Sequence, residues 1–254
     1  MKIAAQLYSL RKAMEKDLDA TLKAVKEMGY DYVQLDGLRG NDIYDVARTL
    51  EKYDLKVIGM HIKHDRFKDD LDGIIFECML FNCKLVYDKY IEDEDQNDRG
   101  YRETKSMLLD AVKILSPLGI RVGLHCPEYD YNNEIDGRIV LDYITDPVDG
   151  MCVYAEPDTY WMSVAGKDPV EEIKRYSGRM PIIHCKDIIS GIDVNDIENN
   201  LIECGKGSVD FKSVFEYGKR NGVEFMVIEQ DLSKQDMFTS MKESLDYLEG
   251  LMSS

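Results

Sequence analysis

Short apolar runs alternate with longer segments of helical period along the whole chain. The runs are rich in β-branched and aromatic residues, and a helical candidate follows each of them. They predict strands at residues 2–8, 32–35, 56–61, 84–87, 121–125, 152–156, 181–186 and 225–230. Repeated strand-then-helix order is typical of a parallel sheet covered by helices. We therefore expect an α/β protein built from eight βα units.

The first helical segment shows the pattern clearly. Leu18, Leu22, Val25 and Met28 recur at helical spacing, and Gly29 follows as a C-cap before the second strand begins. The same order of helix, glycine-containing turn and strand recurs later in the chain. This order favours parallel strands joined by helices.

Two architectures fit such a pattern, an open doubly wound sheet and a closed barrel. The open sheet commonly carries a glycine-rich phosphate loop after its first strand, whereas residues 6–9 here read QLYS. A length of 254 residues matches one barrel, and the acidic run at 92–95 is interpreted as a solvated loop and not as a domain boundary. We expect a single (β/α)8 TIM barrel spanning residues 1–254.

The composition and net charge limit the classes of binding partner that we expect. Hydrophobic residues make up 44% of the chain, and the net charge of −17 opposes binding to nucleic acid or to an anionic membrane face. A signal peptide and an apolar run of roughly 20 residues are both lacking, so we expect a cytoplasmic protein. The six cysteines have no Cys-x-x-Cys spacing and are interpreted as reduced core residues. The oligomeric state stays open, with a homo-oligomer among the alternatives.

Polar residues close the last four predicted strands. They are His125 to Asp130 after the fifth, Glu156 and Asp158 after the sixth, His184 to Asp187 after the seventh, and Glu229 to Asp231 after the eighth. Strand ends in a barrel meet at one face, and adjacent strands lie about 5 Å apart, so these side chains can converge on one divalent ion. Mixed oxygen and nitrogen donors suit Mn²⁺, Zn²⁺, Co²⁺ or Mg²⁺. Each acid taken alone could instead cap a helix.

Taken in order, several short motifs resemble the xylose isomerase-like barrel superfamily, in its sugar phosphate isomerase/epimerase branch. They are residues 6–11 (QLYSLR), 158–161 (DTYW), 165–169 (AGKDP), 178–179 (GR), 184–187 (HCKD), 203–207 (ECGKG) and 229–231 (EQD). The resemblance covers nearly the whole chain. It implies a divalent metal held by Asp130, Asp158, His184 and Glu229.

The segment after the fifth strand departs from that branch. Relatives commonly read His-x-His-x-x-Glu-Phe, whereas residues 125–131 read HCPEYDY. Asp130 then takes the Glu position with a side chain one methylene shorter, so that Glu128 or a water could complete the site instead. Pro127 replaces the second histidine, which indicates a different substrate specificity.

The resemblance also implies a reaction, proton transfer beside a carbonyl through an enediolate. Glu229 would be the acid/base on one face of a small carbohydrate, with Asp130 or Glu128 on the other. Lys186 could stabilise the enediolate oxygen or form a buried ion pair. Candidate substrate contacts, each with an alternative reading as a packed or satisfied side chain, are Tyr8, His61, His125 and Trp161. Candidate anion partners are Arg11, Lys63 and Lys206.

Other functions fit the same barrel. Dehydratases of the inosose or dehydroshikimate type resemble this chain as closely and begin with the same proton abstraction. A related apurinic endonuclease is opposed by the net charge of −17. A catalytically silent sugar-binding barrel is the remaining alternative, because the changes at Asp130 and Pro127 could weaken the metal site.

Overall fold

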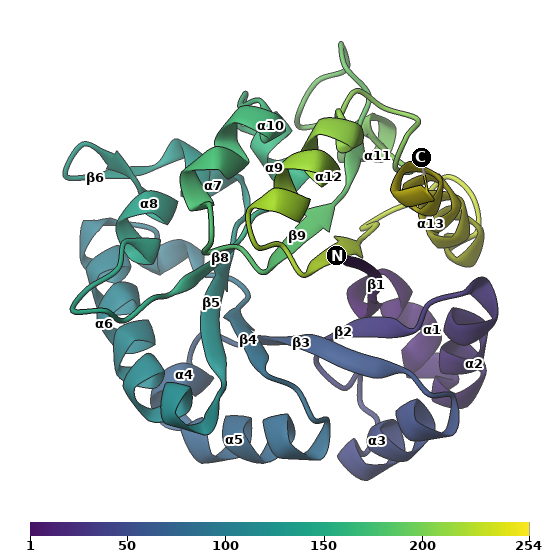
Figure 1. Cartoon of the computed structure of the whole chain (residues 1–254), viewed down its shortest axis with the longest axis horizontal. Helices are drawn as coiled ribbons and strands as arrows, with labels where there is room; N and C mark the ends of the chain where they lie inside the picture. Colours follow the sequence, from purple (N-terminus) through teal and green to yellow (C-terminus); the bar gives the residue numbers. More distant parts are fainter. Residues whose placement is uncertain (254) are drawn as a thin grey trace.

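A parallel barrel forms the centre of the computed structural model, which describes residues 1–253 (Figure 1). Its eight strands run in the order β8-β5-β4-β3-β2-β1-β12-β9, and each paired neighbour is parallel. Their bounds are β1 Lys2–Gln6, β2 Tyr32–Asp36, β3 Lys56–Ile62, β4 Leu85–Asp88, β5 Arg121–His125, β8 Tyr154–Glu156, β9 Ile182–Cys185 and β12 Phe225–Ile228. All eight strands expected from the sequence are confirmed, and so is the α/β barrel.

The barrel closes between β8 and β9 through very few contacts. A single parallel bridge pairs Asp158 with His184, and the His184 amide donates to the Pro157 carbonyl at 2.9 Å. Below this point the Ala155 amide donates to the Arg179 carbonyl at 2.8 Å. The seam therefore lies beside the residues that the sequence marks for chemistry.

Helices surround the strands (Figure 1). They are α1 Arg11–Lys16, α2 Leu18–Met28, α3 Ile43–Lys52, α4 Arg66–Asp69, α5 Leu71–Leu80, α6 Asp98–Leu115, α7 Glu128–Asn132, α8 Val140–Thr145, α9 Thr159–Val164, α10 Pro169–Glu172, α11 Ile197–Asn200, α12 Phe211–Arg220 and α13 Met237–Ser253, with 3-10 turns η1 Leu7–Leu10, η2 Asp93–Asp95, η3 Ser116–Leu118 and η4 Ile173–Tyr176. Two antiparallel pairs lie in loops, β6 Glu134–Ile135 with β7 Arg138–Ile139, and β10 Asp187–Ile188 with β11 Leu201–Ile202. As expected, α2 ends at Gly29, whose φ of 112° permits the left-handed cap.

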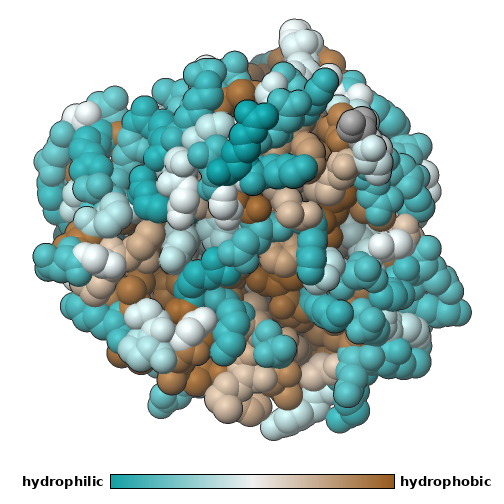
Figure 2. All heavy atoms as spheres, in the orientation of Figure 1, coloured by the Kyte–Doolittle hydropathy of each residue, from teal (hydrophilic) through white to brown (hydrophobic). Residues whose placement is uncertain are grey.

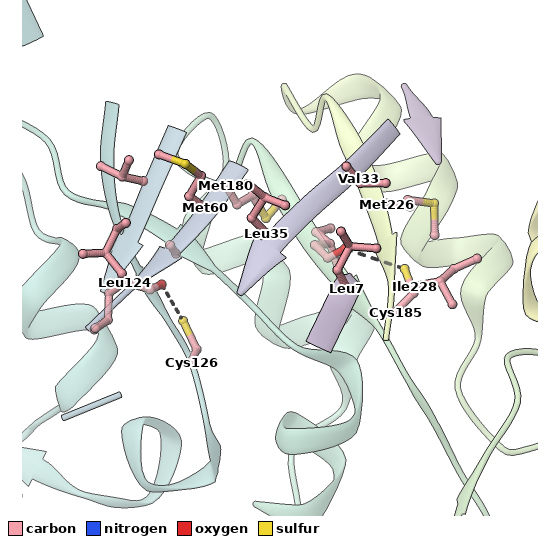
Figure 3. Packing of buried hydrophobic residues seen from close by; sticks show 14 of the residues in the cluster. Leu7, Val33, Leu35, Met60, Leu124, Cys126, Met180, Cys185, Met226 and Ile228 are labelled. Atoms are coloured by element: carbon pink, nitrogen blue, oxygen red, sulfur yellow. Dashed lines mark hydrogen bonds between the residues drawn. The ribbon is translucent and has the colours of Figure 1, made fainter. Parts of the chain in front are cut away.

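Apolar side chains pack in two layers. A small inner cluster fills the barrel and comprises Ala4, Ile58, Leu85, Tyr87, Ile182 and Val227. Gly123 lets Tyr87 fit there, since a Cβ at position 123 would lie 2.4 Å from the Tyr87 ring. The larger layer lies between strands and helices, and Figure 3 shows part of it, with Cys126 and Cys185 donating to the carbonyls of Leu124 and Ile183. Because the inner cluster plugs the barrel, a ligand site must lie at an end of it.

The surface is mostly polar, with apolar side chains exposed in several places. Figure 2 shows apolar atoms in the middle of the drawn face and at its lower edge, where Figure 1 places α5. On α5, Phe76 and Met79 are 45% and 75% exposed, respectively. Within residues 1–253, no helix has the length and apolarity needed to cross a membrane. All six cysteines are free thiols, and Cys152 alone is only partly buried.

Candidate metal centre and reaction cavity

Four buried side chains from four neighbouring strands meet at the carboxyl end of the barrel. His125 ends β5, Asp158 follows β8, His184 lies in β9 and Glu229 follows β12. One donor atom from each lies within 4.8 Å of the others. The spacing brings two imidazoles and two carboxylates to one point.

His125 presents a free nitrogen to this group. Its Nδ1 donates to the Lys89 carbonyl at 3.2 Å, which leaves the lone pair of Nε2 without a hydrogen-bond partner. Burial, helped by the neighbouring His61 and His184 rings, holds the pKa of His125 well below its usual range. A neutral imidazole with an unused, buried nitrogen is suited to binding a metal ion.

Asp158 divides its two oxygens between two roles. Oδ1 accepts from the amides of Tyr160 and Trp161 at 2.9 and 3.1 Å and thereby caps α9. Oδ2 is buried without a hydrogen bond, 3.8 Å from His184 Nδ1 and 4.0 Å from His125 Nε2. The helix-cap alternative and the cluster position therefore apply to the same residue.

A chain of hydrogen bonds orients His184 from inside the barrel. His61 Nε2 and Gln34 Nε2 both donate to the buried Glu156 carboxylate, at 2.6 and 2.5 Å. The Gln34 oxygen, fixed in this orientation, accepts from His184 Nε2 at 2.8 Å. The other nitrogen of His184, Nδ1, is directed at Glu229 Oε2 at 2.8 Å. Partners of this kind set the tautomer and the ring plane of metal-binding histidines.

The charges in the cluster shift its protonation equilibria strongly. Although burial alone would lower it, Glu156 and Glu229 raise the pKa of His184 to about 10. Burial opposes ionisation of Glu229, but Lys186 and His184 hold its pKa well below the usual range. Without a metal, the cluster therefore contains an imidazolium bound to a carboxylate.

Lys186 is buried among three carboxylates. Its ammonium lies 3.1 Å from Asp158 Oδ2, 3.0 Å from Glu229 Oε2 and 3.0 Å from Asp231 Oδ2. Burial would lower its pKa, yet these acids raise the pKa well above the usual value. Trp161 covers it, with the ammonium 5.5 Å from the ring centroid. Lys186 thus remains a fixed cation beside the cluster.

The donor set fits a divalent metal. The cluster and its immediate surroundings contain four carboxylates and one permanent cation, Lys186. The carboxylates are those of Glu156, Asp158, Glu229 and Asp231. A dication reduces this excess of negative charge when His184 releases its proton. Imidazole and carboxylate donors are typical of Zn²⁺, Mn²⁺ and Co²⁺ sites.

A cavity of about 450 Å³ opens directly above the cluster. It is lined by the four candidate substrate contacts, Tyr8, His61, His125 and Trp161, and also by Asp36, Lys89, Tyr90, Pro127, Glu128, Lys186, Glu229 and Asp231. The cavity is large enough for a small sugar, with aromatic faces and hydrogen-bonding groups on its walls.

Asp130 lies outside the group, in contrast to the expectation for the fifth strand. It is fully buried, both of its oxygens lack hydrogen-bond partners, and it does not line the cavity. Burial, with Asp88 and Glu128 nearby, raises its pKa well above the usual value. The reason is local: residues 128–132 form the helical turn α7, where positions two apart point in different directions. Glu128 consequently lines the cavity, and His125 supplies the donor from β5.

The three candidate anion partners lie in different surroundings. Arg11 donates to the carbonyls of Tyr8 and Asp231 and stacks on the Tyr8 ring at 4.1 Å. Lys206 pairs with two glutamates on the surface. Lys63 lines a second cavity at the ends of β2 and β3.

Gln34 was not recognised as a site residue in the sequence, and Glu156 was noted only among the polar residues that close the sixth strand. Both are fully buried polar side chains in strands whose other positions are largely apolar. A polar residue on the inner face of a strand, two positions before the carboxyl end at Asp36, is a signal that could have identified Gln34.

Comparisons with known proteins agree with this fold. Neither the family models nor the curated proteins searched include a match. Among solved structures, a sugar phosphate isomerase/epimerase from Parabacteroides distasonis has a TM-score of 0.81 at 20% identity, covering 97% of each chain. The probable 3-DHS dehydratase AsbF from Bacillus anthracis has a TM-score of 0.76 at 12% identity, covering 98% of this chain and 99% of its own. The IolI protein, solved with a bound zinc atom, has a TM-score of 0.72 at 15% identity, covering 100% of this chain and 98% of its own.

Proposed function

Because the chain has the fold of the xylose isomerase-like TIM barrels, we propose that it is a divalent-metal-dependent isomerase or epimerase of a small carbohydrate. One observation carries the proposal: His125 Nε2 is buried without a hydrogen-bond partner, and Asp158 Oδ2 is buried with ion-pair contacts such as that to Lys186 but no hydrogen bond, beside His184 and Glu229 under a sugar-sized cavity. Buried acceptor atoms without a hydrogen bond are costly unless a ligand uses them. The zinc bound by the IolI neighbour supports a divalent metal in a barrel of this fold.

In this proposal the metal is held by His125, Asp158, His184 and Glu229. Bound there, a divalent ion supplies Lewis-acid polarisation of substrate oxygens. Gln34 keeps His184 oriented by accepting from its Nε2, and this leaves Nδ1 for the metal. The identity of the ion, among Mn²⁺, Zn²⁺, Co²⁺ and Mg²⁺, is left to metal analysis.

Proton transfer is assigned to the carboxylates on the cavity wall. Glu229 is ionised at neutral pH because Lys186 and His184 lower its pKa against the effect of burial, so it can accept the proton beside the carbonyl. Glu128, which lines the cavity from α7, exchanges the proton on the other face. Lys186 contacts Glu229 and lines the same cavity, where its charge stabilises an enediolate oxygen.

Solvent exchange tests this proposal directly. The protein is stripped of metal, reloaded with Mn²⁺ and incubated in D₂O with a panel of ketoses, aldoses and their phosphates, while ¹H NMR follows the carbon beside the carbonyl. Deuterium uptake is expected with at least one sugar, and Glu229→Gln should abolish it. Glu216→Gln, an exposed acid on α12, is the matched control and should exchange normally.

Two results would contradict the isomerase proposal. Absence of exchange with every sugar, in protein shown to contain metal, would favour a silent binding barrel. Loss of water with a new enone absorbance, tested with keto-inositol and dehydroshikimate, would favour a dehydratase, for which the AsbF neighbour is a precedent in the same fold. Both activities begin with proton abstraction, so product analysis separates them.

A further inference from the structure

A second cavity adjoins the one above the metal cluster. It has a volume of about 510 Å³, lies at the carboxyl ends of β2 and β3, and shares Asp36, His61 and Lys89 with its neighbour. Lys89 follows β4 and stands between the two spaces. A substrate whose carbonyl end lies beside Glu229 can therefore extend its other end into this second cavity.

Positive charge is in excess on one wall of the second cavity. Arg39, Lys63 and Lys89 line it. Arg39 and Lys89 pair with one carboxylate, Asp36, at 3.1 and 3.2 Å. Lys63 is exposed and forms no ion pair within residues 1–253. In a chain with a net charge of −17, such an excess is a local exception.

The remaining charged residues that line the cavity reduce this excess without removing it, since four cations face three acids. Arg66 is neutralised by a bidentate pair with Glu77, at 2.8 and 3.1 Å, and by Asp70. Glu15 is an exposed carboxylate of α1. It lies on the first helix, whereas the three cations come from the ends of β2, β3 and β4.

Arg39 has donors that the protein does not use. Its Nε and Nη2 are buried, yet neither makes a hydrogen bond within the described part of the chain, and the contact with Asp36 is an ion pair without hydrogen-bond geometry. A guanidinium carries five N–H groups arranged to match a carboxylate or phosphate. Buried donors of this kind are expected to have a partner.

The loop that carries Arg39 has an unusual backbone. Arg39 has a φ of 53°, between Gly37 at 67° and Gly40 at 78°. A residue with a side chain rarely adopts this region, and ligand-binding segments are among the places where it occurs. The conformation places the Arg39 guanidinium 5.3 Å from the Tyr8 ring centroid, and Tyr8 lines the reaction cavity.

We propose that Arg39, Lys63 and Lys89 form an anion subsite, and that the carbohydrate substrate carries a phosphate monoester or a carboxylate at the end remote from its reacting carbonyl. The inference deepens the proposed function and rests on it for the reacting end. An uncharged sugar would leave the Arg39 donors unused and the excess charge uncompensated. Anionic sugars are therefore preferred over their neutral counterparts.

Binding to metal-free protein tests the subsite apart from catalysis. Glycerol 3-phosphate and D-gluconate are titrated separately by calorimetry, with glycerol as the uncharged reference. At least one anion should bind saturably, and its affinity should fall at least about tenfold in Arg39→Gln and in Lys63→Met, as expected for loss of a charge-assisted contact. Lys23→Met, an exposed lysine in an α2 ion pair, is the matched control and should bind as the unaltered protein does.

The two probes distinguish a substrate that carries a phosphate from one that carries a carboxylate. Binding of glycerol 3-phosphate supports a phosphorylated substrate, and binding of gluconate alone supports an acid sugar. The subsite is overturned if neither anion binds, or if both variants bind as tightly as the control. Lys63 is exposed, so a misfolded variant does not explain a loss at that position. Deuterium exchange on neutral sugars without anion binding would leave the proposed function standing and refute this inference.

Discussion

Asp158 and His184 are paired twice, once by the backbone and once by their side chains. Their residues form the single parallel bridge that closes the barrel between β8 and β9, and Asp158 Oδ2 lies 3.8 Å from His184 Nδ1. The seam of the barrel is thus also the centre of the candidate metal site. An ion bound there would link the two edges of the sheet, so we expect metal to stabilise the fold as well as to serve catalysis.

The first prediction tests whether His125 or Asp130 is the metal ligand supplied by the segment around the end of β5. His125→Leu removes a donor of the cluster and should weaken Mn²⁺ or Zn²⁺ binding at least about 100-fold, as measured by competition with a chromophoric chelator. Asp130→Asn should leave the affinity unchanged, because Asp130 lies outside the metal cluster and does not line the cavity. The reverse pattern would restore Asp130 as the ligand.

The same pair shows where reasoning from the sequence stops. The motif after the fifth strand predicted that this segment bears on the site, with Glu128 as the stated alternative to Asp130. Choosing between them requires knowing that residues 128–132 turn into a helix immediately after Pro127. Continuation of the strand would instead place positions 128 and 130 on one face.

The second prediction concerns the support of His184. Gln34→Met keeps the volume but removes the acceptor for His184 Nε2 and a donor to Glu156. Metal affinity should fall about 10–100-fold, and the free energy of unfolding should fall by about 1–3 kcal/mol because buried polar atoms lose partners. Chelator competition and urea unfolding measure the two effects. Gln235→Met, on the surface, should change neither, and an unaltered affinity in Gln34→Met would refute the orienting role.

The third prediction is a proton release on metal binding. The pKa of His184 is raised to about 10 in the metal-free protein, so the imidazole is protonated at neutral pH and must lose that proton before Nδ1 binds a metal. Affinity should therefore rise about tenfold per pH unit from about pH 6 to about pH 9, and level off above the pKa. Calorimetry in buffers of different ionisation enthalpy should detect about one proton released. An affinity independent of pH would contradict this charge state.

The fourth prediction concerns the buried ammonium. Lys186→Met leaves Asp158, Glu229 and Asp231 without their cation and should cost about 3–5 kcal/mol, lowering Tm by roughly 10 °C. Added Mn²⁺ should raise Tm more in this variant than in the unaltered protein, because it supplies the missing charge. Lys174→Met removes an exposed ion pair and serves as the control. Equal Tm values for the two variants would indicate that the buried pairs contribute little.

The fold could be predicted from the sequence for a physical reason, whereas the hydrogen-bond network inside the barrel could not. Apolar runs and glycine caps report local burial and local turns, and they located all eight strands and the end of α2 at Gly29. The link from Gln34 to His184 joins residues 150 positions apart, and the left-handed backbone at Arg39 depends on its loop. Such relationships arise from the closed barrel and leave no local periodicity to detect.

The central claim is that side chains at the ends of β5, β8, β9 and β12 bind one metal ion. Anomalous scattering from crystals of the protein grown with Zn²⁺ is its most direct test. We expect one peak within bonding distance, about 2.0–2.2 Å, of His125 Nε2, Asp158 Oδ2, His184 Nδ1 and a Glu229 oxygen. The absence of a peak there, or a peak bound by Asp130 in place of His125, would contradict the claim.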